Sequence, residues 1–161
     1  MSGINEELLN KVANLLKEKR IKIATAESCT GGMLANLLTN ISGSSEYFDR
    51  GIVSYSNRAK MEMLGVSKET LDKYGAVSEE TAREMAEGIR RLAKVDMGIS
   101  TTGIAGPTGG TEDKPVGLVY IGLSTKKGTI VKRFIFKKDR IGNKESACEA
   151  ALSMLLEALE S

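Results

Sequence analysis

The stretch from Ile21 to Gly32, IKIATAESCTGG, constrains the fold more than any other part of this sequence. Its apolar first half is typical of a buried strand, and a helical spacing of apolar residues follows Gly32. The paired glycines remove side chains where the helix begins, so its first N–H groups can hold an anion. That anion could be a phosphate or the oxyanion of a carbonyl attacked by Ser28 or Cys29. An ordinary strand-to-helix turn with a small N-cap gives the same pattern.

The composition limits the chemistry, because none of the 161 residues is histidine. A Ser-His-Asp triad is therefore excluded, and a nucleophilic serine must lose its proton to a lysine, a tyrosine, a carboxylate or water. A metal site would have to be built from carboxylates and at most two cysteines. Cys29 and Cys148 lie far apart in the sequence, without the paired spacing of a zinc site.

The cysteine content, the N-terminus without signal character and the lack of a long apolar run predict a reduced, soluble, cytoplasmic protein that contacts no membrane. A length of 161 residues fits a single domain over residues 1–161. The net charge of +2, from 23 basic and 21 acidic residues, argues against nucleic-acid binding through a strong overall field. The basic segment at residues 126–140 is interpreted as a hairpin with a solvated outer face.

Hydrophobic periodicity predicts an alternation of helices and strands along the chain. Helices are expected around residues 8–16, 33–38, 61–64, 67–71 and 78–92 and from about Asn143, with starts at Ser56 or Asn57, at Ser67 and at Ser78. Strands are expected from Ile21 and over residues 50–55, 97–101, 117–124 and 129–136, the last two antiparallel across a turn at 126–128. This order predicts a single three-layer α/β/α domain with a mixed, largely parallel sheet.

Three irregular segments follow predicted strands: ESCTGG, YSNRAK and TGIAGPTGG. Ligands of such sheets collect beyond the carboxyl ends of the parallel strands, where these segments would meet. Together they carry a nucleophile, a base and backbone donors, so the sequence predicts a functional cleft at that edge of the sheet.

The residues also carry a resemblance that runs from about Ile21 to Gly122. TAESCTGG, YSNRAK, LGV followed by TLDKYGAVSEETAREMAEG, and TGIAGPTGGTEDKPVG are similar to the CinA carboxy-terminal domain family, in its stand-alone form. The characterised activity of this family is nicotinamide mononucleotide deamidase. The resemblance implies hydrolysis of the nicotinamide carboxamide to nicotinate mononucleotide and ammonia in pyridine-nucleotide recycling. It further implies a serine nucleophile, no metal, no cofactor and a homodimer or higher homo-oligomer.

Ser28 would then attack the carboxamide. Lys60, in the first turn after the second strand, is the first candidate for the base, because burial and the positive helix end both favour a neutral amine. On its position alone a solvated surface lysine is the favoured interpretation, and only the family pattern reverses this preference. Tyr55 could relay the proton, fix the nicotinamide or simply pack at the strand end. Cys29 is the rival nucleophile, since a helix N-terminus lowers the pKa of a thiol, but a small buried cysteine is common too.

The remaining candidates are assigned to substrate binding. Thr30, Gly31 and Gly32 are candidate donors to the oxyanion or phosphate, and Glu27 could orient Lys60, cap the helix or lie in solvent. The opposite wall of the cleft is assigned to Thr102, Gly103, Ala105, Gly106 and Gly109.

Arg140, in KKDRIGNKESA, matches the arginine of a DR element in the family and is a candidate phosphate ligand, with a surface ion pair as the alternative. The chain departs from the usual pattern here: Lys138 replaces a glycine, and Lys144 is only an approximate second basic residue.

A different class of function fits the same cleft. A non-catalytic module that binds a nucleotide or phosphate would need the same glycine-rich walls without turnover, and ligand-dependent thermal stabilisation without ammonia release would distinguish it. A regulatory role in competence or DNA damage is suggested only by the family's name.

Overall fold

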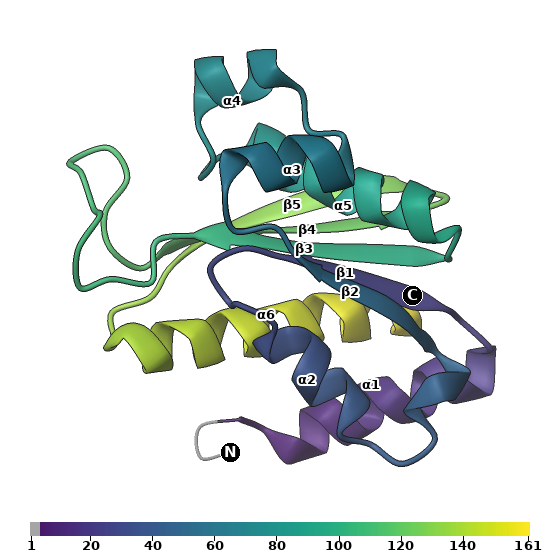
Figure 1. The fold of residues 1–161 in the computed structure, drawn as a ribbon. Coiled ribbons are helices and arrows are strands. Elements are labelled where there is room, and N and C mark those ends of the chain that lie inside the picture. The colour runs from purple at the N-terminus through teal and green to yellow at the C-terminus, as the bar shows by residue number, and fades with distance from the viewer. Residues whose placement is uncertain (1–3) are drawn as a thin grey trace.

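A five-stranded sheet organises residues 4–161, the part of the chain that the computed structural model describes (Figure 1). In chain order the strands are β1 (Ile23–Glu27), β2 (Phe48–Val53), β3 (Met97–Gly103), β4 (Leu118–Thr125) and β5 (Gly128–Ile135). Their spatial order is β2-β1-β3-β4-β5. β1 pairs in parallel with β2 and β3, whereas β4 is antiparallel to both β3 and β5. The predicted mixed sheet is confirmed.

Helices cover both faces of this sheet, which confirms the three-layer α/β/α architecture. One layer contains α1 (Glu6–Lys19), α2 (Met33–Thr39) and α6 (Arg140–Glu160), and the other contains α3 (Asn57–Leu64), α4 (Lys68–Tyr74) and α5 (Glu79–Ala93) (Figure 1). A short 3₁₀ helix, η1 (Ser44–Glu46), precedes β2. None of the helices in the described part of the chain is long and apolar enough to cross a membrane.

Serine caps set the starts of the three helices in the second layer, as the sequence predicts. The side chains of Ser56, Ser67 and Ser78 accept hydrogen bonds from N–H groups three residues further on. Each bond satisfies a donor that the helix itself leaves unpaired. Of the two predicted caps for α3, Ser56 is therefore the one used, which places Lys60 at the end of the first helical turn.

Two predicted boundaries that place site residues are wrong. β2 covers residues 48–53 rather than 50–55, so Tyr55 lies beyond the strand and 62% of its surface is exposed. α6 begins at Arg140 rather than near Asn143, because Asp139 caps it by accepting a bond from the N–H of Gly142 at 2.8 Å. Arg140 is therefore fixed at the first position of a helix instead of lying in a loop.

Two glycines let α5 approach its neighbours closely. A Cβ atom on Gly88 would lie 2.0 Å from the carbonyl oxygen of Leu64 in α3, and one on Gly98 would lie 2.4 Å from that of Ala86. Only glycine permits such backbone contacts. They fix α5 against both β3 and α3, and α3 carries Lys60.

Candidate functional site

A serine and a lysine from different strand ends meet at the carboxyl edge of the sheet. Ser28 directly follows β1, and Lys60 lies in α3 after β2. The Lys60 Nζ atom is 3.1 Å from the Ser28 Oγ atom. Only 1% of the Lys60 surface is exposed, so the alternative of a solvated surface lysine is wrong. The geometry is that of a nucleophile with a base in hydrogen-bond contact.

The other contacts of Lys60 orient its amine. Its Nζ atom also lies 3.0 Å from the main-chain carbonyl oxygen of Ser54 and 3.0 Å from that of Tyr55. Carbonyl oxygens can only accept hydrogen bonds, so they take up both hydrogens of a neutral amine. The lone pair of that amine is then left for the hydroxyl hydrogen of Ser28.

Burial shifts the protonation equilibrium of Lys60 toward the neutral amine. Burial lowers the pKa of Lys60 below its usual value of 10.5, because a buried ammonium loses its hydration. The first turn of α3 adds the positive end of a helix dipole, which also disfavours the charge. Lys60 is therefore suited to take a proton from Ser28.

A cavity of about 420 Å³ opens beside this pair. Its wall contains ten of the predicted site residues: Ser28, Cys29, Tyr55, Lys60, Thr102, Gly103, Ala105, Gly106, Gly109 and Arg140. It also contains Ala76, Val77, Ile104 and Thr108, which the sequence analysis did not single out. The turn before α5, which carries Ala76 and Val77, lies within a motif that resembles the family, but neither residue was predicted to line the site. It joins the site because the Thr102 hydroxyl donates to the Ala76 carbonyl oxygen at 2.7 Å.

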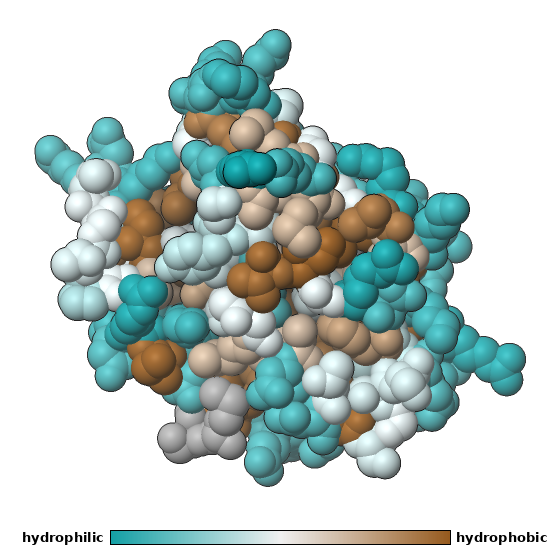
Figure 2. All heavy atoms as spheres, viewed as in Figure 1, coloured by the Kyte–Doolittle hydropathy of each residue, from teal (hydrophilic) through white to brown (hydrophobic). Residues whose placement is uncertain are grey.

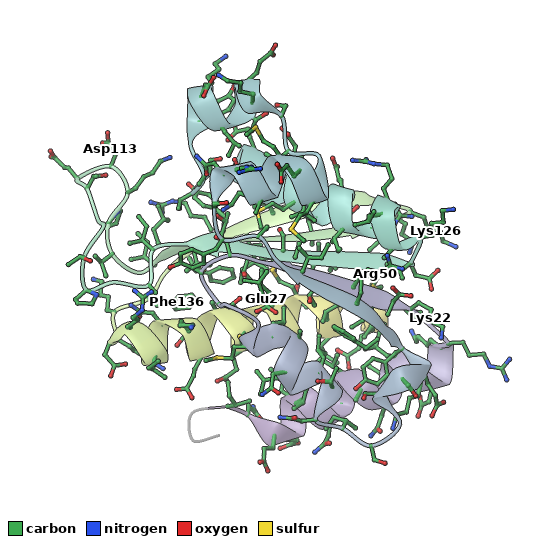
Figure 3. All side chains as sticks on the ribbon, in the orientation of Figure 1. Lys22, Glu27, Arg50, Asp113, Lys126 and Phe136 are labelled. Carbon is green, nitrogen blue, oxygen red and sulfur yellow. The ribbon has the colours of Figure 1, made fainter. Side chains whose placement is uncertain are left out.

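Glu27 does not line the cavity, because its carboxylate caps α2 (Figure 3). It accepts hydrogen bonds from the N–H groups of Leu34 and Ala35, both at 2.9 Å, and from the Thr30 hydroxyl at 2.5 Å. Of the three predicted roles for Glu27, the contacts therefore support the one in which it caps the helix. The sequence analysis allowed a bound phosphate at the start of α2. The Glu27 carboxylate occupies that position instead.

Replacing Glu27 with alanine is expected to lower the free energy of unfolding by about 2–4 kcal/mol, since it leaves the buried N–H of Leu34 and the partly buried N–H of Ala35 without acceptors. Denaturant unfolding measures this loss. The matched variant Glu46→Ala removes an exposed carboxylate from η1 and should stay within about 0.5 kcal/mol of the parent. An equal effect of the two changes would contradict the capping role.

Thr30, Gly31 and Gly32 also lie outside the cavity wall. The Gly31 N–H already donates to the Ser28 carbonyl oxygen at 3.1 Å. For the N–H groups of Cys29 and Thr30, no acceptor is found in another residue among those described. The Gly32 N–H likewise has no acceptor there, and the N–H groups of Cys29 and Thr30, which directly follow the nucleophile in the sequence, are the first candidates for an oxyanion.

Cys29 is poorly suited to be the nucleophile. Only 6% of its surface is exposed, and burial raises the pKa of its thiol to about 12. The reactive form of a cysteine is the thiolate, which at neutral pH is then scarce. Ser28, in contact with Lys60, is the better placed of the two candidates.

The far wall of the cavity is held by the start of α6. Arg140 donates to the Gly106 carbonyl oxygen at 2.6 Å and contacts the Tyr55 hydroxyl at 3.3 Å. Tyr55 in turn reaches Lys60 through its main-chain carbonyl. Asn143, which the sequence analysis missed as a site residue, is 1% exposed and donates to the Ala105 carbonyl oxygen at 3.0 Å. The sequence signal that could have identified Asn143 is its position as the only amide at the start of the apolar face of α6.

No group of three or more His, Cys, Asp or Glu side chains in residues 4–161 is placed to hold a metal ion. The walls of the cavity instead offer hydroxyl groups, main-chain groups, the Lys60 amine and the cationic side chain of Arg140. This set fits a polar organic substrate that carries negative charge.

The chain matches one known family over nearly all of its length. The family model described as the CinA C-terminal domain matches residues 5–159. A CinA-like protein from Kosmotoga olearia is 52% identical over 158 residues, which are 98% of this chain and 38% of that protein, and one from Chloroherpeton thalassium is 56% identical over 154 residues. The chain thus spans little more than a third of the length of these curated relatives.

Solved structures share the whole fold. The competence/damage inducible protein CihA from Agrobacterium tumefaciens aligns over 100% of both chains with a TM-score of 0.94 and 40% identity. A CinA superfamily protein from Escherichia coli aligns over 94% of this chain and 90% of its own, with a TM-score of 0.88 and 34% identity. This chain belongs to the CinA C-terminal domain family.

Proposed function

We propose that the chain is a nicotinamide-nucleotide amidohydrolase, which converts nicotinamide mononucleotide to nicotinate mononucleotide and ammonia. The observation that carries the proposal is the 3.1 Å contact between the Ser28 hydroxyl and the buried Lys60 amine on the wall of a cavity. Amide hydrolysis needs a nucleophile and a group that passes its proton to the departing amine. The choice of substrate rests on the resemblance of the site motifs to the family's characterised deamidase.

The proposed reaction uses the contacts of these residues. Ser28 Oγ attacks the carboxamide carbon while Lys60 Nζ takes the hydroxyl proton. The resulting ammonium of Lys60 then gives that proton to the nitrogen as the C–N bond breaks, which releases ammonia and leaves an ester on Ser28. A water molecule attacks the ester, Lys60 takes its proton and returns one to Ser28 Oγ, and the acid is released. We assign the N–H groups of Cys29 and Thr30 to the oxyanion.

Arg140 is the proposed ligand of the substrate phosphate. Its guanidinium lies on the cavity wall and is held in place by the Gly106 carbonyl oxygen. An arginine anchored in this way presents its remaining N–H groups in a fixed plane to a phosphate. The two free cysteines, Cys29 and Cys148, are consistent with a reducing compartment, and we place the reaction in the cytoplasm.

Arg140→Met is expected to raise KM for nicotinamide mononucleotide about tenfold or more while kcat changes little, because it removes binding that is equal in ground and transition states. Steady-state kinetics measure the two constants separately. Arg58→Met removes an exposed arginine from α3 and serves as the matched control. A fall in kcat at unchanged KM would contradict the phosphate assignment.

Two assays on the purified protein test the proposed function. One measures ammonia and nicotinate mononucleotide formed from nicotinamide mononucleotide, and the other measures thermal stabilisation by the same compound. Turnover with equal amounts of both products supports the amidohydrolase. Stabilisation without any turnover would instead indicate the non-catalytic nucleotide-binding module.

A further inference from the structure

The loop between β3 and β4, residues 104–117, has no regular secondary structure, and its first half forms one wall of the candidate cavity. It extends to the left of the molecule in Figure 1, and Asp113 marks its tip in Figure 3. Much of the surface on that side is pale in Figure 2, as expected for a segment rich in Gly, Thr and Pro. Such a segment has few large apolar side chains to hold it by packing, so its position depends on hydrogen bonds from neighbouring elements.

The first turn of α6 holds two consecutive carbonyl groups of this loop. Asn143 Nδ2 donates to the Ala105 carbonyl oxygen at 3.0 Å, and Arg140 donates to the Gly106 carbonyl oxygen at 2.6 Å. Residues three positions apart on a helix lie on the same face, so both side chains reach the loop from one side. The cavity wall at Ala105 and Gly106 is therefore tied to α6.

Both ends of the Asn143 amide are used, which fixes its orientation. The Oδ1 atom accepts a hydrogen bond from the Lys138 N–H at 2.9 Å, while Nδ2 donates to Ala105. With nitrogen and oxygen exchanged, two acceptors would face each other at Ala105 and two donors at Lys138. Only 1% of the Asn143 surface is exposed, so water competes little for either bond. Asn143 thus links the loop to the segment that leads into α6.

The bond to Ala105 also sets the direction of the next N–H group. The peptide bond between Ala105 and Gly106 is trans, so its N–H points opposite to its carbonyl group and therefore away from Asn143. No acceptor for the Gly106 N–H is found among the described residues. Because Ala105 and Gly106 both line the cavity, this donor is available to a molecule bound there.

We propose that Asn143 is a positioning residue for substrate binding, which holds the Ala105–Gly106 segment so that the Gly106 N–H and the Arg140 guanidinium act on the substrate together. Arg140 is anchored on the Gly106 carbonyl, so a shift of this segment moves both donors. Two such donors suit an anionic oxygen, as in a phosphate group. This role rests on the proposed function, because the molecule it serves is the substrate.

Asn143→Asp separates positioning from packing, because the two side chains have nearly the same shape. The aspartate keeps an acceptor for the Lys138 N–H but places an oxygen against the Ala105 carbonyl oxygen. KM for nicotinamide mononucleotide should rise about tenfold or more, with a smaller change in kcat. The dissociation constant, measured by isothermal titration calorimetry, should rise by a similar factor, and this measurement requires no turnover.

The pH dependence of binding gives a readout that a purely structural defect would not show. Burial raises the pKa of the new carboxyl group, and below that pKa its O–H can again donate to the Ala105 carbonyl oxygen. The ratio of the dissociation constants of Asn143→Asp and the parent should therefore fall toward one as the pH is lowered. A ratio that does not fall would contradict the role of this bond.

Three further variants complete the test. Leu152→Ala removes buried apolar atoms from the same helix away from the loop, so it should lower the midpoint of thermal unfolding but leave KM close to that of the parent. Asn10→Asp makes the same change at an exposed position of α1 and should leave KM unchanged. If Asn143→Asp does not fold, Asn143→Ser replaces it, because its shorter side chain cannot bridge Lys138 and Ala105, and the same rise in KM is expected.

The outcomes distinguish this inference from the proposed function. An unchanged KM and dissociation constant in Asn143→Asp or Asn143→Ser, or an equal rise in Leu152→Ala, would overturn the positioning role and leave the proposed function intact. A parent chain that neither binds nor converts nicotinamide mononucleotide would refute the proposed function, and the positioning role with it.

Discussion

Ser28→Ala is expected to lower ammonia release from nicotinamide mononucleotide by about 10³-fold or more, whereas Cys29→Ala should keep most of the activity. The reason is the contact geometry: Ser28 Oγ lies 3.1 Å from the amine of Lys60, while the Cys29 thiol has its pKa raised to about 12 by burial. Initial rates of the two variants beside the parent measure the difference. Both changes are small, so thermal unfolding can verify that each variant is folded.

The reverse result would reassign the nucleophile. If Cys29→Ala lost its activity and Ser28→Ala kept it, the thiolate would have to form during the reaction despite its burial. If both variants kept their activity, water itself would be the attacking group and no ester would form on the protein.

Lys60→Met is expected to lower kcat by about 10²–10⁴-fold, the usual contribution of a positioned base, with a smaller change in KM. Methionine fills a similar volume but can take no proton. The pH dependence is the sharper readout. Because the neutral amine is the active form, kcat of the parent should rise with pH through the lowered pKa of Lys60 and level off below the 10.5 of a free lysine.

The same variant changes the pH dependence of stability. With its pKa lowered by burial, folded Lys60 binds fewer protons than the unfolded chain between that lowered pKa and 10.5. The free energy of unfolding should therefore rise with pH in this window, and the rise should be absent in Lys60→Met. Lys68→Met, at an exposed position of α4, is the control and should leave the rate profile unchanged. A rate profile in Lys60→Met that still shows the parent's rise would rule out Lys60 as the base.

Local signals in the sequence predicted the fold well. The starts of α3, α4 and α5 depend on serine caps that contact residues three positions away, and such contacts can be identified from the sequence. The predicted bounds of β2 were displaced by two residues. This exposed edge strand, FDRGIV, lacks the alternation of apolar and polar residues that marks a half-buried strand.

The site was harder to predict because the roles of its residues depend on contacts between residues that are far apart in the sequence. From the sequence alone, Lys60 could be either a catalytic base or a solvated surface lysine. Lys60 is buried, and its amine contacts Ser28, which follows β1 and lies 32 residues away in the chain. Asn143 was overlooked for the same reason: its partner, the Ala105 carbonyl, lies 38 residues away. From the sequence, Glu27 could cap α2 or orient Lys60. Only the three-dimensional position of α2 decides between these roles.

The most direct test of the account is to quench the reaction with acid during turnover of nicotinamide mononucleotide and to determine the mass of the protein and of its peptides. The account predicts an added nicotinate mononucleotide acyl group on the peptide that contains Ser28 and Cys29, present in the parent and in Cys29→Ala and absent in Ser28→Ala. An adduct that persists in Ser28→Ala, or ammonia release by the parent with no covalent adduct at any quench time, would contradict it.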